Sequence, residues 1–194
     1  TWQEVNDIAV VWAKIEEWNP GVHDAICFFA EDKKGFFVGE LDGKPVSCIS
    51  AVRYNDKFGF IGFYIVAKKH RGKGYGLKLF KHALRYLGER NIGADGVLER
   101  VEDYKTMGFM PYYKNRRYVG KGFKKKTISE NIKDIKDVNF NLLASYDDSI
   151  FPAKRHKFLK CWITQPLSRG FVYLKGKTMG GYGVIRKCFE GFKI

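Results

Sequence analysis

The residues with the clearest chemical potential form one short run, Arg71-Gly72-Lys73-Gly74-Tyr75-Gly76, with Lys69 just before it. Glycines let the backbone approach a ligand closely and adopt dihedral angles that other residues avoid. When such a loop leads directly into a helix, several backbone N–H groups and the helix N-terminus converge on one anion. Lys69, Arg71 and Lys73 add full positive charges beside them. The run therefore predicts a phosphate-binding site, with a pyrophosphate as its natural occupant.

Two common phosphate-binding motifs do not fit this run. The P-loop pattern G-x-x-x-x-G-K-S/T needs a Ser or Thr to hold magnesium, and none stands at the required place. The dinucleotide fingerprint G-x-G-x-x-G orders its glycines differently and needs an acidic residue about 20 positions further on. The strand before the run also leaves an antiparallel arrangement and not a βαβ unit. A different kind of phosphate loop is indicated.

The elements before the loop are read from the spacing of apolar residues. Apolar side chains at three- and four-residue steps predict a helix from about Val5 to Trp18, and a second short helix is expected at 23–31. The pattern then becomes strand-like, with turns at Asp42-Gly43 and Asn55-Asp56. An antiparallel meander is predicted, with strands at 35–41, 45–54 and 58–66.

The elements after the loop begin with a helix that has Leu77, Phe80, Leu84 and Leu87 on one face. The remaining elements of this part are shorter. We expect a strand at 96–98, a helix at 100–107, and two further strands at 110–113 and 117–120.

The loop in this setting resembles the pyrophosphate-binding segment of the GNAT family of N-acetyltransferases, whose hallmark is Gln/Arg-x-x-Gly-x-Gly/Ala after an antiparallel strand. Residues 71–76 meet it at every fixed position. Tyr64-Ile65-Val66 stands where that family has Leu-x-Val, with Tyr in place of Leu. The run from Tyr104 to Phe109 is similar to the family's Tyr-x-x-x-Gly-Phe. The resemblance covers about residues 1–120 and implies an α+β fold, a mixed but mostly antiparallel twisted sheet flanked by helices.

The resemblance implies an acyl-CoA-dependent N-acyltransferase that moves an acetyl group from acetyl-CoA to an amine of a small molecule or peptide. Main-chain groups of the third strand would pair with the pantetheine arm, and the loop amides would hold the pyrophosphate. A splay between the third strand and the strand at 96–98 would admit the thioester. The cofactor-binding residues implied are Tyr64, Ile65, Val66, Arg71, Gly72, Lys73, Gly74, Tyr75, Gly76 and Leu77.

Two residues are candidates for the proton transfers of this reaction. Tyr104 is the candidate general acid for the departing thiolate, and its alternative is a tyrosine packed at the edge of the domain. The third strand holds no Asp, Glu or His, so the nearest acidic candidate is Glu99, with Asp95 behind it. Glu99 is equally a residue that a helix dipole would stabilise. His70 and His82 are expected to be solvated or packed.

The second half repeats the first at an offset of 133 residues, as in His156 with His23, Leu174 with Leu41 and Arg186 with Arg53. A fixed offset across helix, strand and turn indicates a tandem duplication. The layout resembles the two-domain branch that pairs an acetyltransferase domain with a divergent acetyltransferase-like one. We expect a first domain at 1–120, a basic linker at 121–127 and a partial second domain at 128–194. The chain is expected to be a fragment, because the second copy stops where its third strand should begin.

Charge and composition limit the classes of partner. The net charge is +14; residues 1–120 carry 19 basic and 15 acidic residues, and residues 121–194 carry 16 and 6. A cofactor with phosphates accounts for the basic cluster at 68–90, while the excess in the second half has no assigned role. The four cysteines form no CxxC pair and the histidines no HExxH, so no metal is expected. No run is long enough to span a membrane. We expect reduced, mostly buried thiols and a cytoplasmic protein.

Two other classes of function stay open from the sequence. One is a non-catalytic CoA-binding or sensing module, because the third strand has no acid and the second half is degenerate. The other is a nucleic-acid-binding protein that uses the basic second half, including Lys124-Lys125-Lys126. The acceptor amine and the oligomeric state have no readable signal in the sequence.

Overall fold

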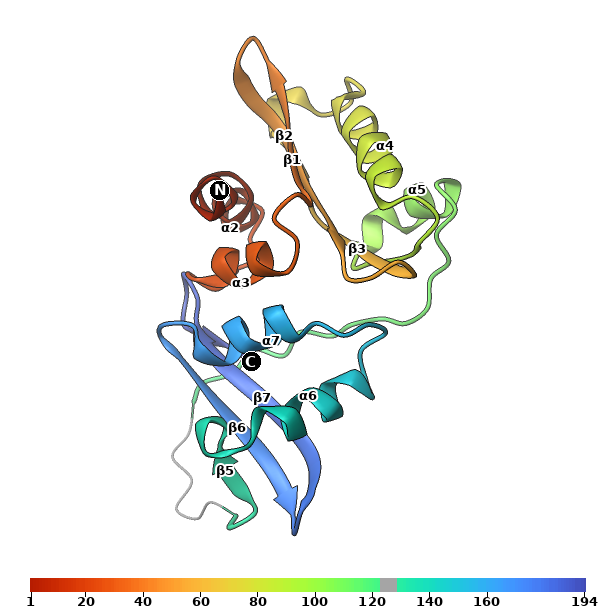
Figure 1. The fold of residues 1–194 in the computed structure, drawn as a ribbon. Helices are drawn as coiled ribbons and strands as arrows, with labels where there is room; N and C mark the ends of the chain where they lie inside the picture. Colours follow the sequence, from red (N-terminus) through yellow and green to blue (C-terminus); the bar gives the residue numbers. More distant parts are fainter. Residues whose placement is uncertain (123–128) are drawn as a thin grey trace.

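A computed structural model describes residues 1–122 and 129–194, which form two four-stranded sheets (Figure 1). The first sheet has the order β1-β2-β3-β4, and the second has the order β5-β6-β7-β8. We call the parts that contain these sheets the first unit (residues 1–122) and the second unit (residues 129–194). The expected linker at 121–127 lies mostly outside the described residues, and the predicted domain boundaries stay a prediction.

The meander of the first unit forms as predicted. Strands β1 (Phe36–Leu41), β2 (Lys44–Arg53) and β3 (Phe58–Val66) pair antiparallel in sequence order. The turn between β1 and β2 consists of Asp42 and Gly43, both at positive φ, as a tight hairpin turn requires. Strand β4 (Asn91–Ala94) adds a parallel neighbour to β3, which makes the sheet mixed.

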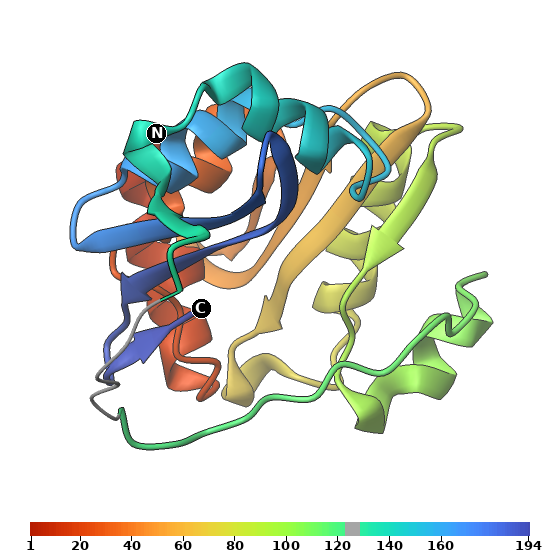
Figure 2. The ribbon, with the colours of Figure 1, turned by 90° about the horizontal axis from the view of Figure 1, so that it is seen from below.

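Helices cover both faces of the first sheet, as Figure 2 shows from below. On one face lie α1 (Trp2–Glu4), a π-helical stretch (Val5–Val10) and α2 (Val11–Ile15), which run on as one helix, followed by α3 (Asp24–Glu31). On the other face lies α4 (Tyr75–Leu87). Two apolar clusters result, one on each face. The first contains Val5, Ala9, Val10, Ala13, Ala25, Cys48 and Ile65, and the second contains Ile49, Ala51, Ile61, Leu79, Phe80, Ala83 and Leu87.

Three of the predicted strands are wrong. The strand expected at 96–98 lies instead at Asn91–Ala94, and residues 98–100 form a 3-10 turn (Leu98–Arg100) before helix α5 (Val101–Thr106). The position of β4 is decided by its pairing with Phe58 to Ile61, a tertiary contact that local propensity does not report. The stretches 110–113 and 117–120 form no strand in the described chain. Their side chains are exposed, and strand-forming residue types alone do not suffice without a neighbouring strand.

The second unit repeats the helix-helix-hairpin order of the first. It starts with β5 (Ile132–Asp134) and a 3-10 turn (Ile135–Asp137). Helices α6 (Phe140–Asp148) and α7 (His156–Thr164) follow, and then β6 (Ser168–Lys175), β7 (Thr178–Lys187) and β8 (Phe192–Lys193). The helices and one face of the sheet enclose a cluster of Ile135, Leu143, Ala144, Leu159, Val172, Met179 and Val184.

The hairpins of the two units correspond at an offset of 134 and not the predicted 133. Leu41 pairs with Lys44 across the turn of the first hairpin, and Lys175 pairs with Thr178 across the second. Side chains alternate between the faces of a strand, so a one-residue shift reverses the face. Arg53 accordingly lies over Tyr86 of α4, whereas Arg186 points to the opposite face and reaches α3. The equivalence expected between these two arginines is wrong.

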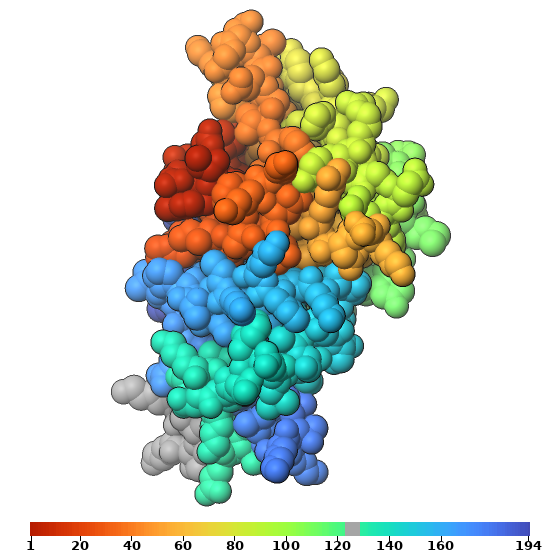
Figure 3. All heavy atoms as spheres, in the orientation of Figure 1, coloured from red at the N-terminus to blue at the C-terminus, as the bar shows by residue number. Residues whose placement is uncertain are grey.

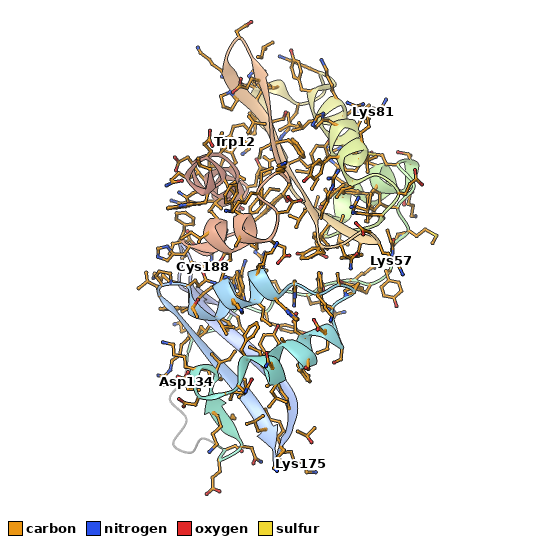
Figure 4. All side chains as sticks on the ribbon, viewed as in Figure 1. Trp12, Lys57, Lys81, Asp134, Lys175 and Cys188 are labelled. Carbon is orange, nitrogen blue, oxygen red and sulfur yellow. The ribbon has the colours of Figure 1, made fainter. Side chains whose placement is uncertain are left out.

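The two units meet through α3 and α7, which lie side by side between the sheets (Figures 1 and 3). The buried side chain of Arg186 donates to both carboxylate oxygens of Asp24, at 2.7 and 3.1 Å. Gly21 pairs with Cys188 in a short antiparallel bridge at the same junction, where Figure 4 labels Cys188. Specific polar contacts as well as apolar packing therefore hold the units together.

The cysteines contribute to packing. Cys27, Cys48 and Cys188 are buried and Cys161 is half-buried, all as free thiols. Burial raises the pKa of the Cys48 thiol to about 12, so it stays protonated at neutral pH. Within residues 1–122 and 129–194, no three His, Cys, Asp or Glu side chains gather as a metal site would require. Over the same residues, no helix has the length and apolarity to cross a bilayer.

Candidate functional site

The edge of β3 that faces β4 loses its partner halfway along the strand. Phe58 to Ile61 pair with β4, whose last paired residue is Ala94. Beyond that point, no strand in the described parts of the chain pairs with residues 62–66 on this edge, while β2 pairs with the other edge. The two parallel strands therefore diverge, and main-chain groups at the end of β3 are free to pair with an extended ligand. The splay was predicted, but its second wall is β4 and not 96–98.

A β-bulge marks the place where the strands diverge. Cys48 pairs with Ile65 and Ser50 with Gly62, so both Phe63 and Tyr64 stand opposite Ile49. Phe63 takes a φ of 47°, which is uncommon for an aromatic residue. Such backbone strain is concentrated at functional sites. The bulge sends the Tyr64 ring toward Phe80 on the α4 face, with ring centroids 5.2 Å apart.

The glycine loop joins this open edge to helix α4. Val66 is followed by a 3-10 turn (Lys68–His70), and Gly74 is the N-terminal cap of α4. Gly72 and Gly74 have φ values of 72° and 81°, and a Cβ at either position would meet no atom within 4 Å. These two glycines are thus required by the backbone conformation, and the space beside them is open. The first N–H groups of a helix have no partner within it, so those of Tyr75, Gly76 and Leu77 can bind an anion.

Gly76 has a different role from the two loop glycines. A Cβ on Gly76 would lie 2.7 Å from the Tyr64 hydroxyl and 2.8 Å from Cγ2 of Val66. The absence of a side chain therefore lets the first turn of α4 rest directly on β3. This contact fixes the distance between the helix N-terminus and the open strand edge.

Arg71 is used for support and not as a free charge at the loop. Its Nε donates to the Val66 carbonyl at 2.9 Å, and its Nη2 lies 2.5 Å from a Glu16 carboxylate oxygen. The loop is thereby tied to the end of β3 and to the helix on the other face. Glu16 was not among the predicted residues, because 55 positions separate it from Arg71 and no spacing rule joins them.

The remaining charge at the loop comes from lysines. Lys69 and Lys73 are exposed, and nothing in the described chain forms an ion pair with either. The His70 Nδ1 atom is buried without a hydrogen-bond partner among the described residues. Desolvation and the two lysines lower the pKa of His70, so its ring is neutral at pH 7. The loop therefore presents positive charge mainly through exposed lysine side chains and its amides.

Tyr104 lies on the same side of the sheet as Tyr64. Its ring packs against Phe80 and Phe109, at centroid distances of 6.3 and 5.7 Å, and covers Gly96. Burial and, to a smaller extent, the Asp103 carboxylate raise the pKa of Tyr104. Burial raises the pKa of Tyr64 to about 12, and the nearby Tyr104 adds to this shift. Both hydroxyls are protonated at neutral pH.

Glu99 does not stand at the end of a strand as expected. It is exposed in the 3-10 turn that precedes α5, five residues after the last residue of β4. Asp95 is closer to the strand end, where it accepts a hydrogen bond from Asn115 at 3.2 Å. The structure thus brings together the loop, the strand edge and Tyr104, but leaves Glu99 at the surface.

Two pockets of the second unit lie away from the glycine loop. One cavity of about 490 Å³ is lined by residues including Leu167, Ile185 and Phe192. Another of about 550 Å³ lies against Val138, Phe140 and Ile163. Neither includes a residue of the first unit, so neither belongs to the site around the glycine loop.

An α+β fold whose parallel strand pair splays beside a glycine loop at a helix N-terminus is the architecture of the acetyltransferase class. Comparison with protein families agrees. Residues 2–122 match the acetyltransferase (GNAT) family, and residues 143–194 match a further acetyltransferase (GNAT) domain. The chain belongs to the GNAT family and contains two such domains in tandem.

Individual relatives support the same assignment. The chain is 35% identical over 193 residues to the holothin acyltransferase of Pseudoalteromonas sp. (strain SANK 73390), covering all of this chain and 64% of that protein. It is 27% identical over 127 residues to an uncharacterized protein of Caenorhabditis elegans, covering 60% of this chain and 40% of that one. The chain thus spans less than two thirds of the length of either relative.

One solved structure shares most of the fold. A crystal structure from Pyrococcus horikoshii, described as a "Putative Acetyltransferase", matches with a TM-score of 0.69 over 93% of this chain and 67% of that one. The sequence identity is 16%, so this likeness concerns the fold alone.

Proposed function

We propose that this chain transfers an acetyl group from acetyl-CoA to a primary amine. The observation that carries the proposal is the unpaired edge of β3 at residues 62–66, which leads directly to the glycine loop at the N-terminus of α4. A ligand with an amide-bearing arm and a pyrophosphate fits both features at once. When bound, acetyl-CoA supplies an activated thioester carbonyl.

The residues that hold the cofactor are those of the strand end and the loop. Main-chain groups of Tyr64, Ile65 and Val66 pair with the pantetheine amides. The amides from Gly72 to Leu77 hold the pyrophosphate, and Lys73 adds charge. Arg71 keeps the loop in place through Glu16, so it acts on the cofactor indirectly. The open space beside Gly72 and Gly74 accommodates the phosphate oxygens.

Tyr104 is proposed as the general acid. The neutral amine nitrogen attacks the thioester carbonyl carbon; the C–N bond forms, the C–S bond breaks, and the thiolate takes the hydroxyl proton of Tyr104. The proton released by the amine returns through water to the tyrosinate, so one thiol and one amide result. The raised pKa of Tyr104 means that its hydroxyl carries the proton before the reaction.

The role of Glu99 is proposed more narrowly. After Asp95, which is bound to Asn115, Glu99 is the next acidic residue beyond the end of β4. A water molecule would have to relay the proton from the amine to it. Its exposed place at the start of a helical turn fits the helix-terminus alternative equally well. We therefore expect Glu99→Gln to reduce turnover less than Tyr104→Phe.

The acceptor is proposed to be a small-molecule amine. The support is the 35% identity to a protein named for acyl transfer to holothin. This chain spans 64% of that relative, so a small-molecule acceptor is proposed for it from this likeness.

The proposal is tested by titrating acetyl-CoA into the protein calorimetrically and by following thiol release with an amine panel that includes holothin. We expect saturable binding, and in Tyr104→Phe a kcat lowered about 100-fold with little change in CoA affinity. Tyr118→Phe is the control, because Tyr118 is 85% exposed and lies outside the site. No heat with either acetyl-CoA or CoA would refute the proposal.

A non-catalytic CoA-binding module is the second candidate. It is favoured by the exposed position of Glu99 and by the absence of Asp, Glu and His from β3. Tight CoA binding without thiol release across the amine panel would select it.

A further inference from the structure

Four aromatic rings from both units meet at the junction between them. Phe28 of α3 lies edge-on to Phe63 of β3, with centroids 5.6 Å apart, and parallel to Phe158 of α7 at 6.0 Å. Trp162 of α7 stacks on Phe158 at 5.0 Å and lies 6.0 Å from Phe28. All four side chains are half-buried, so each keeps some surface uncovered. We call this set the junction rings.

The junction rings reach the point where the first sheet splays. Phe63 is one of the two bulged residues of β3, next to the unpaired edge at 62–66. Its neighbour Tyr64 points to the α4 face, which is filled by Phe80 and Tyr104. Phe63 points to the opposite face, toward α3. Because the glycine loop leads into α4 and Tyr104 lies on the same face, an acceptor that reaches a thioester held at the strand edge comes from the opposite face, along Phe63 and its ring neighbours.

The charged groups around the junction rings already have partners. Arg186, which lies 4.3 Å from the Trp162 ring, is bound to Asp24. Arg155, 5.4 Å from the Phe158 ring, is bound to Asp147. The Glu31 carboxylate accepts the Phe158 N–H at 2.9 Å. The surroundings therefore favour a flat apolar body over a highly charged one.

We propose that the junction rings form the wall against which the acceptor packs, and that the acceptor is an amine carried on a flat, apolar ring system. The inference rests on the proposed function, because it concerns the second substrate of the same site. It gives the second unit a direct part in specificity: Phe158 and Trp162 of α7 complete a surface that Phe28 and Phe63 begin.

The test compares two amines of nearly equal size, 2-phenylethylamine and 2-cyclohexylethylamine, titrated calorimetrically into the CoA-saturated protein. Only the first has a planar π-system. We expect it to bind about three- to tenfold more tightly, the range that an aromatic contact adds beyond simple burial. Phe28→Leu and Phe158→Leu should each remove most of this preference without changing the affinity for CoA.

Phe189→Leu is the matched control. Phe189 is an aromatic residue of the second unit that also packs against the first, where Lys14 lies 4.6 Å from its ring, but it is not one of the junction rings. This variant should keep the preference. If the two amines bind equally, if neither binds, or if Phe189→Leu removes the preference as fully as Phe158→Leu, the inference is wrong.

The outcomes separate this inference from the proposed function. Ring-selective binding without thiol release would support the wall and refute the transferase. Thiol release without ring preference would do the reverse.

Discussion

The two units build the same helix-helix-hairpin core and use the hairpin differently. In the first, α4 covers the outer face of the hairpin and carries the glycine loop at its N-terminus. In the second, the outer face of β6 leaves Phe171 and Tyr173 exposed, and no helix covers it within the described residues. The inner face of the second hairpin instead supplies Arg186 to the first unit. The comparison teaches that the two units share one core, and that the glycine loop and α4, which follow β3, provide the candidate site of the first unit.

The largest expected effect concerns the contact that joins the units. Asp24→Asn leaves Arg186 buried without a counter-charge and should lower the free energy of unfolding by about 3 to 5 kcal/mol. Chemical denaturation followed by tryptophan fluorescence and by circular dichroism measures this loss. We expect the two probes to coincide in the wild type and to separate into two transitions in the variant as the units uncouple.

Arg169→Leu is the control for this prediction, since it breaks the exposed pair with Asp134 within the second unit. It should leave a single transition close to that of the wild type. A single, barely shifted transition in Asp24→Asn would show that the two units are not coupled through this pair.

The next expected effect compares the glycine loop of the first unit with the hairpin turn of the second. Gly74→Glu places a carboxylate at the proposed phosphate site and a side chain at a φ of 81°, and should weaken CoA binding at least about 100-fold, or about 2.7 kcal/mol. Gly176→Glu makes the same change at a φ of 60° in the turn of the second hairpin. Calorimetry should find CoA affinity unchanged there. Equal losses in both variants would point to a general folding defect.

The smallest expected effect is a pH-dependent change in stability that arises from Asp147 of the second unit. Burial alone would raise the pKa of Asp147, but hydrogen bonds from Arg155 and Tyr182 outweigh it and leave the pKa lowered. A carboxyl with a lowered folded pKa stabilises the protein above its unfolded value of about 4, and this stabilisation is lost as the pH falls through the folded pKa.

Asp147→Asn should therefore cost about 1 to 2 kcal/mol at pH 7, and the difference from wild type should shrink below about pH 4. Urea unfolding across this range measures it, with the exposed Asp137→Asn as the control. A difference that stays constant down to pH 2 would contradict the assignment.

Local sequence signals predicted the parts of the fold that are locally determined. The meander and the glycine loop follow from alternation, turn residues and glycine spacing, and β1, β2, β3 and α4 form where expected. Strand β4 was misplaced because Asn91-Ile92-Gly93-Ala94 has weak strand propensity and gains its place from pairing with β3. The stretches 110–113 and 117–120 contain strand-forming residue types, but they have no neighbouring strand in the described chain and form none.

The candidate site was predictable to a similar degree. The loop residues and Tyr104 were proposed from motifs and stay a prediction, whereas the support of Arg71 by Glu16 depends on a contact across 55 positions. The junction rings were invisible for the same reason, since Phe28 and Phe158 are brought together only by the docking of two units.

The ion pair between Asp24 and Arg186 also has a consequence for synthesis on the ribosome. The two partners are separated by 162 positions, and the contacts of Asn19 with Glu190 and of Trp18 with Lys193 span 171 and 175. The first unit can emerge and collapse before these partners are synthesised. The Asp24 carboxylate therefore stays hydrated until Arg186 has been made. Contacts of such separation form slowly. We therefore expect docking of the two units to be a late step of folding. Until it occurs, Phe28 and Phe63 lack Phe158 and Trp162, the other two junction rings.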